Sequence, residues 1–233
     1  MYYGYGYGID PTFLLIIIGI IISMAASAKM NAAFSRYSRV PSASGLSGAE
    51  TAQRILQSQG LYDVRVQHVQ GTLTDHYDPR SKTVNLSDAV YGSGSIAAVG
   101  VAAHECGHAV QDAVGYRMLD LRTAMVPVVN VGAQLSWPMI LIGVMFGGTS
   151  LISIGILLFS LSVAFQLVTL PVEYNASSRA LTMLEDTGIL QGSEISQTRE
   201  VLGAAALTYV AAAAGSLLQL LRLMAIFGGR RRD

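Results

Sequence analysis

The longest uncharged stretch of the sequence constrains its fold more than any other feature. No aspartate, glutamate, lysine or arginine occurs from Thr123 to Val172. This length accommodates two membrane-spanning helices, and residues 147–150 (Gly-Gly-Thr-Ser) have the composition of a tight turn between them. We expect the second span at residues 151–170. The first contains residues that in a membrane helix usually face protein or a cavity, namely Pro127, Asn130, Gln134 and Pro138.

A further apolar run, Thr12 to Ala28, is close to the minimum length for crossing a bilayer. No basic residue precedes it, which argues against a cleaved signal peptide and favours a retained membrane helix. Lys29, Arg36 and Arg39 follow it, so the positive-inside rule predicts an N-terminus outside and a cytoplasmic chain from residue 29 onward. The Tyr/Gly-rich residues before the run are typical of an aromatic belt at the membrane interface.

The C-terminal apolar region has two interpretations. No charged residue occurs between Glu200 and Arg222, so residues 201–227 are long enough for a fourth span. The arginines at 230–232 would then lie outside, against the charge rule. Alternatively, this alanine-rich helix packs on another part of the protein or lies in the membrane interface. The sequence does not separate the two.

Composition agrees with a membrane protein, since 52% of the residues are hydrophobic and 13% are charged. The formal net charge of zero gives no indication of nucleic-acid binding. Cys106 is the one cysteine, so an intrachain disulfide is excluded. We interpret Cys106 as a small buried filler.

Residues 42–94 are expected to form soluble structure. Ser47 to Glu50 is a capping box that opens a helix, and Gly60 is expected to end it. The alternation in residues 63–67 predicts a strand, and residues 72–77 and 82–86 flank a turn sequence, which predicts a hairpin. Such a sheet offers an edge strand to an extended peptide.

The motif His104-Glu105-Cys106-Gly107-His108 lies in a small, apolar, helical stretch that we expect at residues 96–114, with Ser95 as N-cap and Gly115 as terminator. On a helix the two histidines share one face, so their ring nitrogens can converge on one ion. Two imidazoles and a third protein ligand leave one position of a zinc ion open for water. Glu105 is placed to take a proton from that water as it attacks a carbonyl.

The third ligand is expected from a second helix. Pro171 is suited to begin one, and Glu173 then lies in its first turn. A carboxylate at this place completes a His₂Glu zinc site. The alternative is a glutamate that the helix dipole favours, but the upstream motif makes the ligand interpretation the stronger one.

These motifs resemble the YugP-like neutral zinc metallopeptidases of bacterial membranes. The resemblance rests on the H-E-C-G-H motif, on residues 171–177 (Pro-Val-Glu-Tyr-Asn-Ala-Ser) after a hydrophobic hairpin, and on residues 73–80 and 206–211. More distantly the chain is similar to the HtpX-like and CAAX prenyl proteases, which are gluzincins. The resemblance implies zinc held by His104, His108 and Glu173, with Glu105 as general base. It also implies that Ser177 stands where relatives have a ligand-supporting aspartate.

We therefore expect a membrane-embedded endopeptidase that binds one zinc ion per chain and acts at the cytoplasmic face of a bacterial plasma membrane. Asp112, one turn after His108, is a candidate support for a ligand. Tyr209, His76 and Arg179 are candidates for contacting the transition state or the substrate. Expected partners are a peptide or protein substrate and the lipid bilayer, and a homo-oligomer is compatible with the sequence. Two alternatives remain: a non-catalytic membrane scaffold with a structural metal, and a zinc hydrolase of a non-peptide amide.

The predicted fold is mainly α, with three or four transmembrane helices, a small β-hairpin or sheet and a gluzincin-like core around the H-E-x-x-H helix. We divide the chain into a tail and first span (1–28), a cytoplasmic catalytic part (29–122), a transmembrane hairpin (123–170), and a third-ligand helix followed by a C-terminal hydrophobic helix (171–233).

Overall fold

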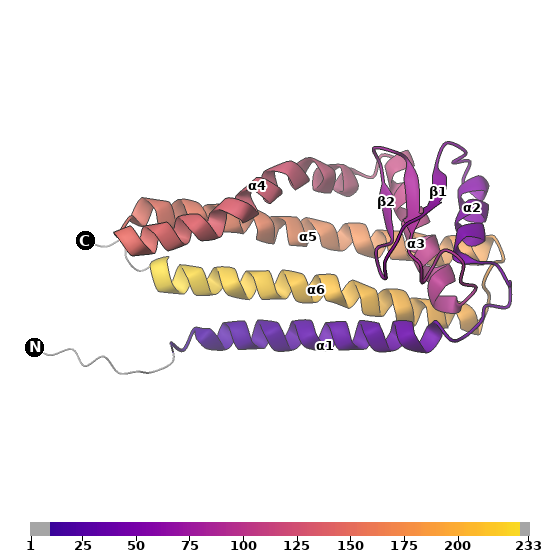
Figure 1. Cartoon of the computed structure of the whole chain (residues 1–233), viewed down its shortest axis with the longest axis horizontal. Helices are drawn as coiled ribbons and strands as arrows, with labels where there is room; N and C mark the ends of the chain where they lie inside the picture. The colour runs from indigo at the N-terminus through magenta and orange to yellow at the C-terminus, as the bar shows by residue number, and fades with distance from the viewer. Residues whose placement is uncertain (1–9, 229–233) are drawn as a thin grey trace, which may run out of the picture. The chain divides into compact units, whose positions relative to one another are not determined.

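The computed structural model describes residues 10–228, so the Tyr/Gly-rich tail and the terminal arginines, on which two expectations rest, lie outside the described residues. The described chain is mainly helical with one three-stranded sheet (Figure 1). In chain order the elements are α1 (Phe13–Tyr37), α2 (Gly48–Ser58), β1 (Arg65–His68), β2 (His76–Asp78), β3 (Thr83–Leu86), α3 (Ile96–Ala113), α4 (Arg117–Phe146), α5 (Thr149–Asp186) and α6 (Ser193–Phe227). This confirms the predicted fold class.

The chain divides into two compact units. Of the described residues, one unit contains residues 10–25, 125–167 and 211–228, and the other contains residues 26–124 and 168–210. Among the described residues, α1, α4, α5 and α6 are long and apolar enough to cross a membrane. Each of these helices contributes residues to both units. The length and hydropathy of α6 therefore fit the fourth span that the sequence left open.

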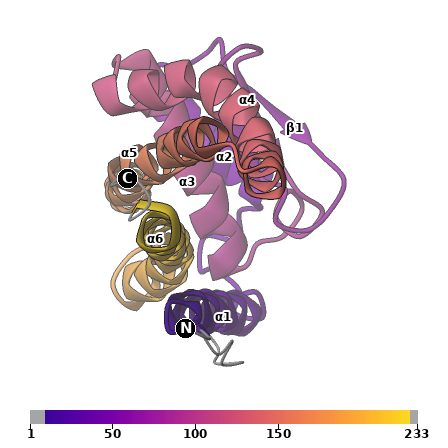
Figure 2. The same ribbon diagram turned by 90° about the vertical axis from the view of Figure 1, so that its left-hand side faces the viewer.

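In the first unit, α4 and α5 form the predicted hairpin and lie side by side (Figure 2). Its turn contains Gly147, whose φ of +71° is in the region that favours glycine. Close packing depends on small residues, because a Cβ on Gly155 would lie 2.8 Å from the Ser136 carbonyl oxygen. Similarly, a Cβ on Gly19 of α1 would lie 3.4 Å from Cα of Gly215 in α6. Small residues at such contacts are typical of membrane helices.

In the second unit, the expected local structures before α3 are confirmed. Ser47 and Glu50 form the capping box that begins α2. Strands β2 and β3 form the predicted antiparallel hairpin, and β1 pairs with β3 in parallel, which gives the order β1-β3-β2. Both β1 and β2 are therefore edge strands.

Helix α3 passes through the core of the second unit. Its N-cap is Ser95, whose hydroxyl accepts a hydrogen bond from the amide of Ala98, and Gly115 follows its end with a φ of +63°. The fully buried side chains that other parts of the chain contribute to this core include Ile55, Leu86, Leu184 and Leu190. Cys106 is also buried here, as expected. Burial of this apolar surface fixes the helix that carries the H-E-x-x-H motif.

One prediction is wrong. Pro171 does not begin a helix, because α5 runs without interruption from Thr149 to Asp186 and contains Pro171 in its interior. A proline inside a helix removes one backbone hydrogen bond, and long apolar helices tolerate that loss where neighbouring helices pack against them. Glu173 is consequently in the interior of a long helix and not in a first turn.

Candidate metal centre

Two helices of the second unit bring the three expected ligands together. His104 and His108 lie on α3, and Glu173 lies on α5. Their potential ligand atoms are all within 4.8 Å of one another. Oε2 of Glu173 is 3.3 Å from Nε2 of His104 and 3.6 Å from Nε2 of His108. The side chain of Glu173 is only 3% exposed, so this carboxylate is held away from bulk water.

The approach of the two helices depends on Gly107. A Cβ at this position would lie 2.5 Å from the carbonyl oxygen of Ala176 on α5. Real Cβ atoms do not come so close to a backbone oxygen. The glycine between Cys106 and His108 therefore lets α5 lie against α3 at the height where Glu173 meets the histidines.

His108 is oriented by a hydrogen-bonded amide. The Nε2 of Gln111 donates to the carbonyl of Val172 at 2.8 Å and to Oδ1 of Asn175 at 3.0 Å. These two acceptors leave Oε1 of Gln111 to face Nδ1 of His108, 3.0 Å away. Since an amide oxygen only accepts, Nδ1 of His108 must donate, and the neutral ring then carries its electron pair on Nε2.

His104 has a simpler support. Oγ of Ser177, on α5, lies 3.1 Å from Nδ1 of His104. A hydroxyl can donate or accept, so this contact orients the ring without fixing which nitrogen holds the proton. Glu173 has a further contact on its other oxygen, because Nη2 of Arg122 lies 3.9 Å from Oε1.

The donor set fits a zinc ion. Oε2 of Glu173 is buried and accepts no hydrogen bond from the described residues, although it faces the Nε2 atoms of both histidines. Burial disfavours a charged His108, but the carboxylates of Glu173 and Glu105 outweigh burial and raise the pKa of His108. The site thus favours a positive charge where imidazole and carboxylate electron pairs meet, and these are the ligand types of zinc.

Glu105 is buried beside the cluster with 7% of its surface exposed, and it borders a cavity of about 190 Å³. His104, Glu173 and Ser177 border the same cavity. The remaining residues that line it come from α1, the segment before β2, α3 and α6: Met30, Leu73, Asp75, Val101, Leu202, Ala205, Ala206, Thr208 and Tyr209. Two potential ligands, His104 and Glu173, therefore line the same cavity as the carboxylate of Glu105, and most of the other lining residues are apolar.

Of the four other candidate residues, only Tyr209 lines this cavity. His76 is exposed on β2, with Nδ1 2.9 Å from the carbonyl oxygen of Thr74, and does not line the cavity. Arg179 donates to Oδ1 of Asn175 at 2.8 Å. Asp112 accepts a hydrogen bond from the hydroxyl of Tyr77 at 2.8 Å.

Sequence reasoning missed Gln111 and Arg122. Gln111 is three residues after His108 and thus on the same helix face, so a systematic search of that face for polar residues would have found it. Arg122 gave no such signal, because only the tertiary structure brings it to Glu173.

The cluster defines the class of protein. Two histidines of an H-E-x-x-H helix, a glutamate from a second helix and a free carboxylate beside them are the features of a zinc metallopeptidase site.

Comparison with known proteins agrees and gives the family. Residues 12–228 match the family described as "Putative neutral zinc metallopeptidase", and the chain belongs to this family. It is 49% identical over 213 residues to the "Putative membrane protease YugP" of Bacillus subtilis (strain 168), covering 91% of this chain and 95% of that protein. No solved structure matches the chain.

Proposed function

We propose that the protein is an endopeptidase that hydrolyses peptide bonds of protein substrates at the cytoplasmic face of the bacterial plasma membrane, with Glu105 as general base. The observation that carries this proposal is the position of Glu105, which is buried beside the cluster and borders the same cavity as His104 and Glu173. A purely structural metal site is usually closed by four protein ligands and needs no further carboxylate.

One zinc ion per chain would be held by His104, His108 and Glu173. Bound there, zinc supplies Lewis-acid polarisation of the substrate carbonyl and makes water more acidic. Glu105 takes a proton from the attacking water as its oxygen bonds to the carbonyl carbon. It then delivers this proton to the amide nitrogen as the C–N bond breaks, so the same carboxylate serves both steps.

Tyr209 is our candidate for the donor to the developing oxyanion. Its side chain lines the cavity, whereas His76 and Arg179 do not. A phenol that donates where negative charge develops stabilises the transition state more than the ground state. The hydrogen bond of Arg179 to Asn175 supports the network around His108 and suggests a structural role for that arginine.

The edge strand β2 is our candidate for holding the substrate backbone. Leu73 and Asp75 lie in the segment before β2 and line the cavity, and among the described residues β2 has no partner strand on the side away from β3. The carboxylate of Asp75 fixes this segment, since it accepts hydrogen bonds from the amide and hydroxyl of Ser87 at 2.7 and 2.9 Å. An extended peptide added to β2 would run past the ligands with its backbone hydrogen-bonded.

The proposed orientation places the N-terminus outside and residues 29–122 in the cytoplasm. It is supported by Lys29, Arg36 and Arg39 after the first apolar run. Labelling of single cysteines introduced at residues 42–94 with an impermeant maleimide tests it. Protection in intact cells agrees with the proposal, and rapid labelling would reverse the orientation while leaving the proposed chemistry intact.

The proposed catalysis is tested by zinc content and casein cleavage of detergent-solubilised wild type and Glu105→Gln. We expect both proteins to contain zinc and the variant to cleave about 10²- to 10⁴-fold more slowly, the usual contribution of a general base. Glu185→Gln, which removes an exposed carboxylate outside the cavity, is the matched control and should cleave like wild type.

Other results would favour the alternatives. Equal cleavage by wild type and Glu105→Gln would show that the base is another residue. Stoichiometric zinc without cleavage of casein or any peptide would favour the membrane scaffold, and cleavage of a lipid amide instead would favour the non-peptide hydrolase.

A further inference from the structure

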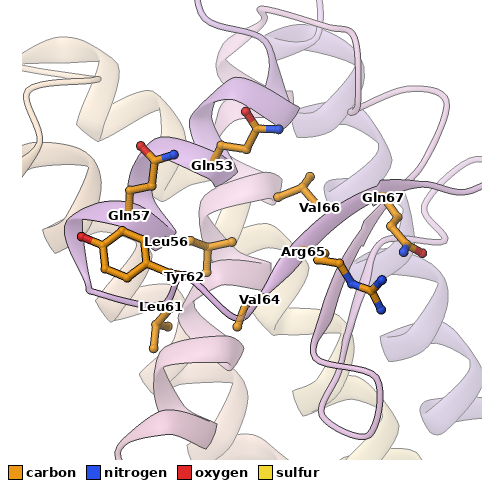
Figure 3. Close-up of a pocket in the computed structure, with 9 residues that line it drawn as sticks. All are labelled: Gln53, Leu56, Gln57, Leu61, Tyr62, Val64, Arg65, Val66 and Gln67. Carbon is orange, nitrogen blue, oxygen red and sulfur yellow. The ribbon is translucent and has the colours of Figure 1, made fainter.

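A second cavity, of about 370 Å³, lies in the same unit but shares no residue with the metal centre. Helix α2, the segment after it and strand β1 form its lining, which we call the β1 groove (Figure 3). The lining residues are Gln53, Leu56, Gln57, Leu61, Tyr62, Val64, Arg65, Val66 and Gln67. Tyr62 is 81% exposed, so a large aromatic side chain stands at this groove in solvent.

The β1 groove follows the open edge of the sheet. Within β1, Val66 projects from one face and Arg65 and Gln67 from the other, as Figure 3 shows for Val66 and Arg65. A cavity lined from both faces of a strand borders its edge. Since β3 pairs with β1 on one side only, the other edge has no strand partner among the described residues.

The strand register identifies the backbone amides and carbonyls of β1 that do not pair with β3. The amide of Arg65 donates to Lys82 and that of Val69 donates to Leu86, both on the β3 side. In a parallel ladder alternate residues point to the same neighbour, so residues 65, 67 and 69 face β3. The amides and carbonyls of Val66 and His68 therefore point to the open edge.

The charge of the β1 groove is positive. Arg65 is its single charged lining residue, and the ion pairs of the described residues do not include it. The nearby Asp63 is already paired with Lys82 at 2.5 Å. Gln53, Gln57 and Gln67 add amides that can both donate to and accept from a peptide backbone.

We propose that the β1 groove binds an extended acidic segment of a polypeptide, which pairs with the open edge of β1 and places a carboxylate at Arg65. Open strand edges give such a segment its backbone hydrogen bonds, and the partly exposed apolar side chains of Leu61 and Val64 receive alternate side chains. The groove is a recognition site apart from the catalytic cavity and does not depend on the role of Glu105.

The test uses fluorescence polarisation with the full-length Glu105→Gln protein in detergent, a background chosen to prevent cleavage. The probe is a labelled octapeptide of alternating valine and glutamate, and its partner has lysine in place of glutamate. We expect the acidic probe to bind more tightly than the lysine probe. Arg65→Glu should weaken the acidic probe about two- to fivefold and strengthen the lysine probe, because an exposed ion pair is exchanged for a repulsion. Arg80→Glu, outside both cavities, is the charge control.

A second variant tests the backbone pairing. Val66→Pro removes an amide that faces the open edge and leaves the bonds to β3 in place, so binding should weaken about fivefold. Because the Val66 side chain also packs against the core, we expect a fall in melting temperature that is smaller than the fall for Gln67→Pro. Gln67→Pro removes an amide that donates to β3, so it serves as the control for the effect of a disrupted sheet on probe affinity and thermal stability.

Unchanged affinity in both Arg65→Glu and Val66→Pro would overturn the proposal. So would a dimer in light scattering that Val66→Pro dissociates, because the open edge would then pair with a second copy of the chain. Failure of wild type to cleave casein would count against the catalytic role of Glu105 and would leave the binding result standing.

Discussion

The two histidines of the metal centre lie one turn apart on α3, yet the protein supports them differently. Nδ1 of His108 meets Gln111, whose own amide group is fixed by a backbone carbonyl and by Asn175. Nδ1 of His104 meets one hydroxyl, that of Ser177. His104 also borders the catalytic cavity, whereas His108 does not.

This difference separates two tasks. Behind His108, the acceptors Val172 and Asn175 orient the amide of Gln111, and that amide orients the imidazole ring. This network therefore sets the tautomer of His108 without a bound metal. The His104 side is open to the cavity and adjustable, because a hydroxyl rotates to suit the state of the ring. We infer that affinity for the metal depends more on the His108 side.

The largest effect on zinc affinity is expected from a residue that influences the supports of both His104 and His108. Gly107→Ala places a Cβ 2.5 Å from the Ala176 carbonyl, and the backbone must shift to relieve the contact. Since Ala176 lies between Asn175 and Ser177 on α5, the partners behind His108 and behind His104 should both move. Overpacking of this kind typically costs about 1–3 kcal/mol of unfolding free energy. We expect zinc affinity to fall about a hundredfold or more, measured by competition with a chromophoric chelator at fixed pH.

Gly203→Ala is the matched control for this prediction. Gly203 also lies inside a helix of the second unit, but apart from its own helix backbone no described atom lies within 4 Å of a Cβ there. Alanine has the higher helix propensity, so this variant should be as stable as wild type or slightly more stable. If Gly107→Ala bound zinc as tightly as Gly203→Ala, the close approach of α3 and α5 would not be what sets the ligand geometry.

A smaller loss is expected when only the His108 side is changed. Gln111→Met keeps an unbranched side chain of similar length but removes all three hydrogen bonds, in a position with no exposed surface. Loss of a partner behind a ligand typically costs about 10- to 100-fold in metal affinity, and we expect the upper part of this range.

Asp112→Asn is the control for Gln111→Met. Asp112 is the neighbour of Gln111, but its contact is with the hydroxyl of Tyr77, and asparagine retains an acceptor for that contact. The chelator competition should therefore give wild-type affinity. A loss in Asp112→Asn equal to that in Gln111→Met would mean that the end of α3 as a whole, and not the amide behind His108, determines affinity.

Much of the fold could be predicted because its signals are local. The capping box at Ser47, the N-cap at Ser95, the turn glycines and the long apolar runs each depend on neighbouring residues. The error at Pro171 has the same origin, since the local preference of proline for helix starts was overridden by packing along a long apolar helix. The parallel pairing of β1 with β3 joins segments separated by the hairpin, and the sequence pattern did not indicate it.

The metal cluster was predictable for a similar reason. The spacing of His104 and His108 places both on one face, and Glu173 follows in a recognisable second motif. The network behind His108 was not predicted, because it uses an amide, an asparagine and a backbone carbonyl on two helices. Such contacts depend on how closely α3 and α5 approach, which Gly107 controls.

The smallest effect on zinc affinity is expected when only the support of His104 is changed. Ser177→Ala removes one hydroxyl at 3.1 Å from His104 and leaves the network of Gln111 intact. Zinc affinity should fall about tenfold, at the lower end of the range for residues behind a ligand. Ser177→Asp should have the opposite sign, because a carboxylate accepts from Nδ1 of His104 and leaves the electron pair on Nε2. If Ser177→Ala cost more affinity than Gln111→Met, the open side would be the principal support and the comparison between the two histidines would be reversed.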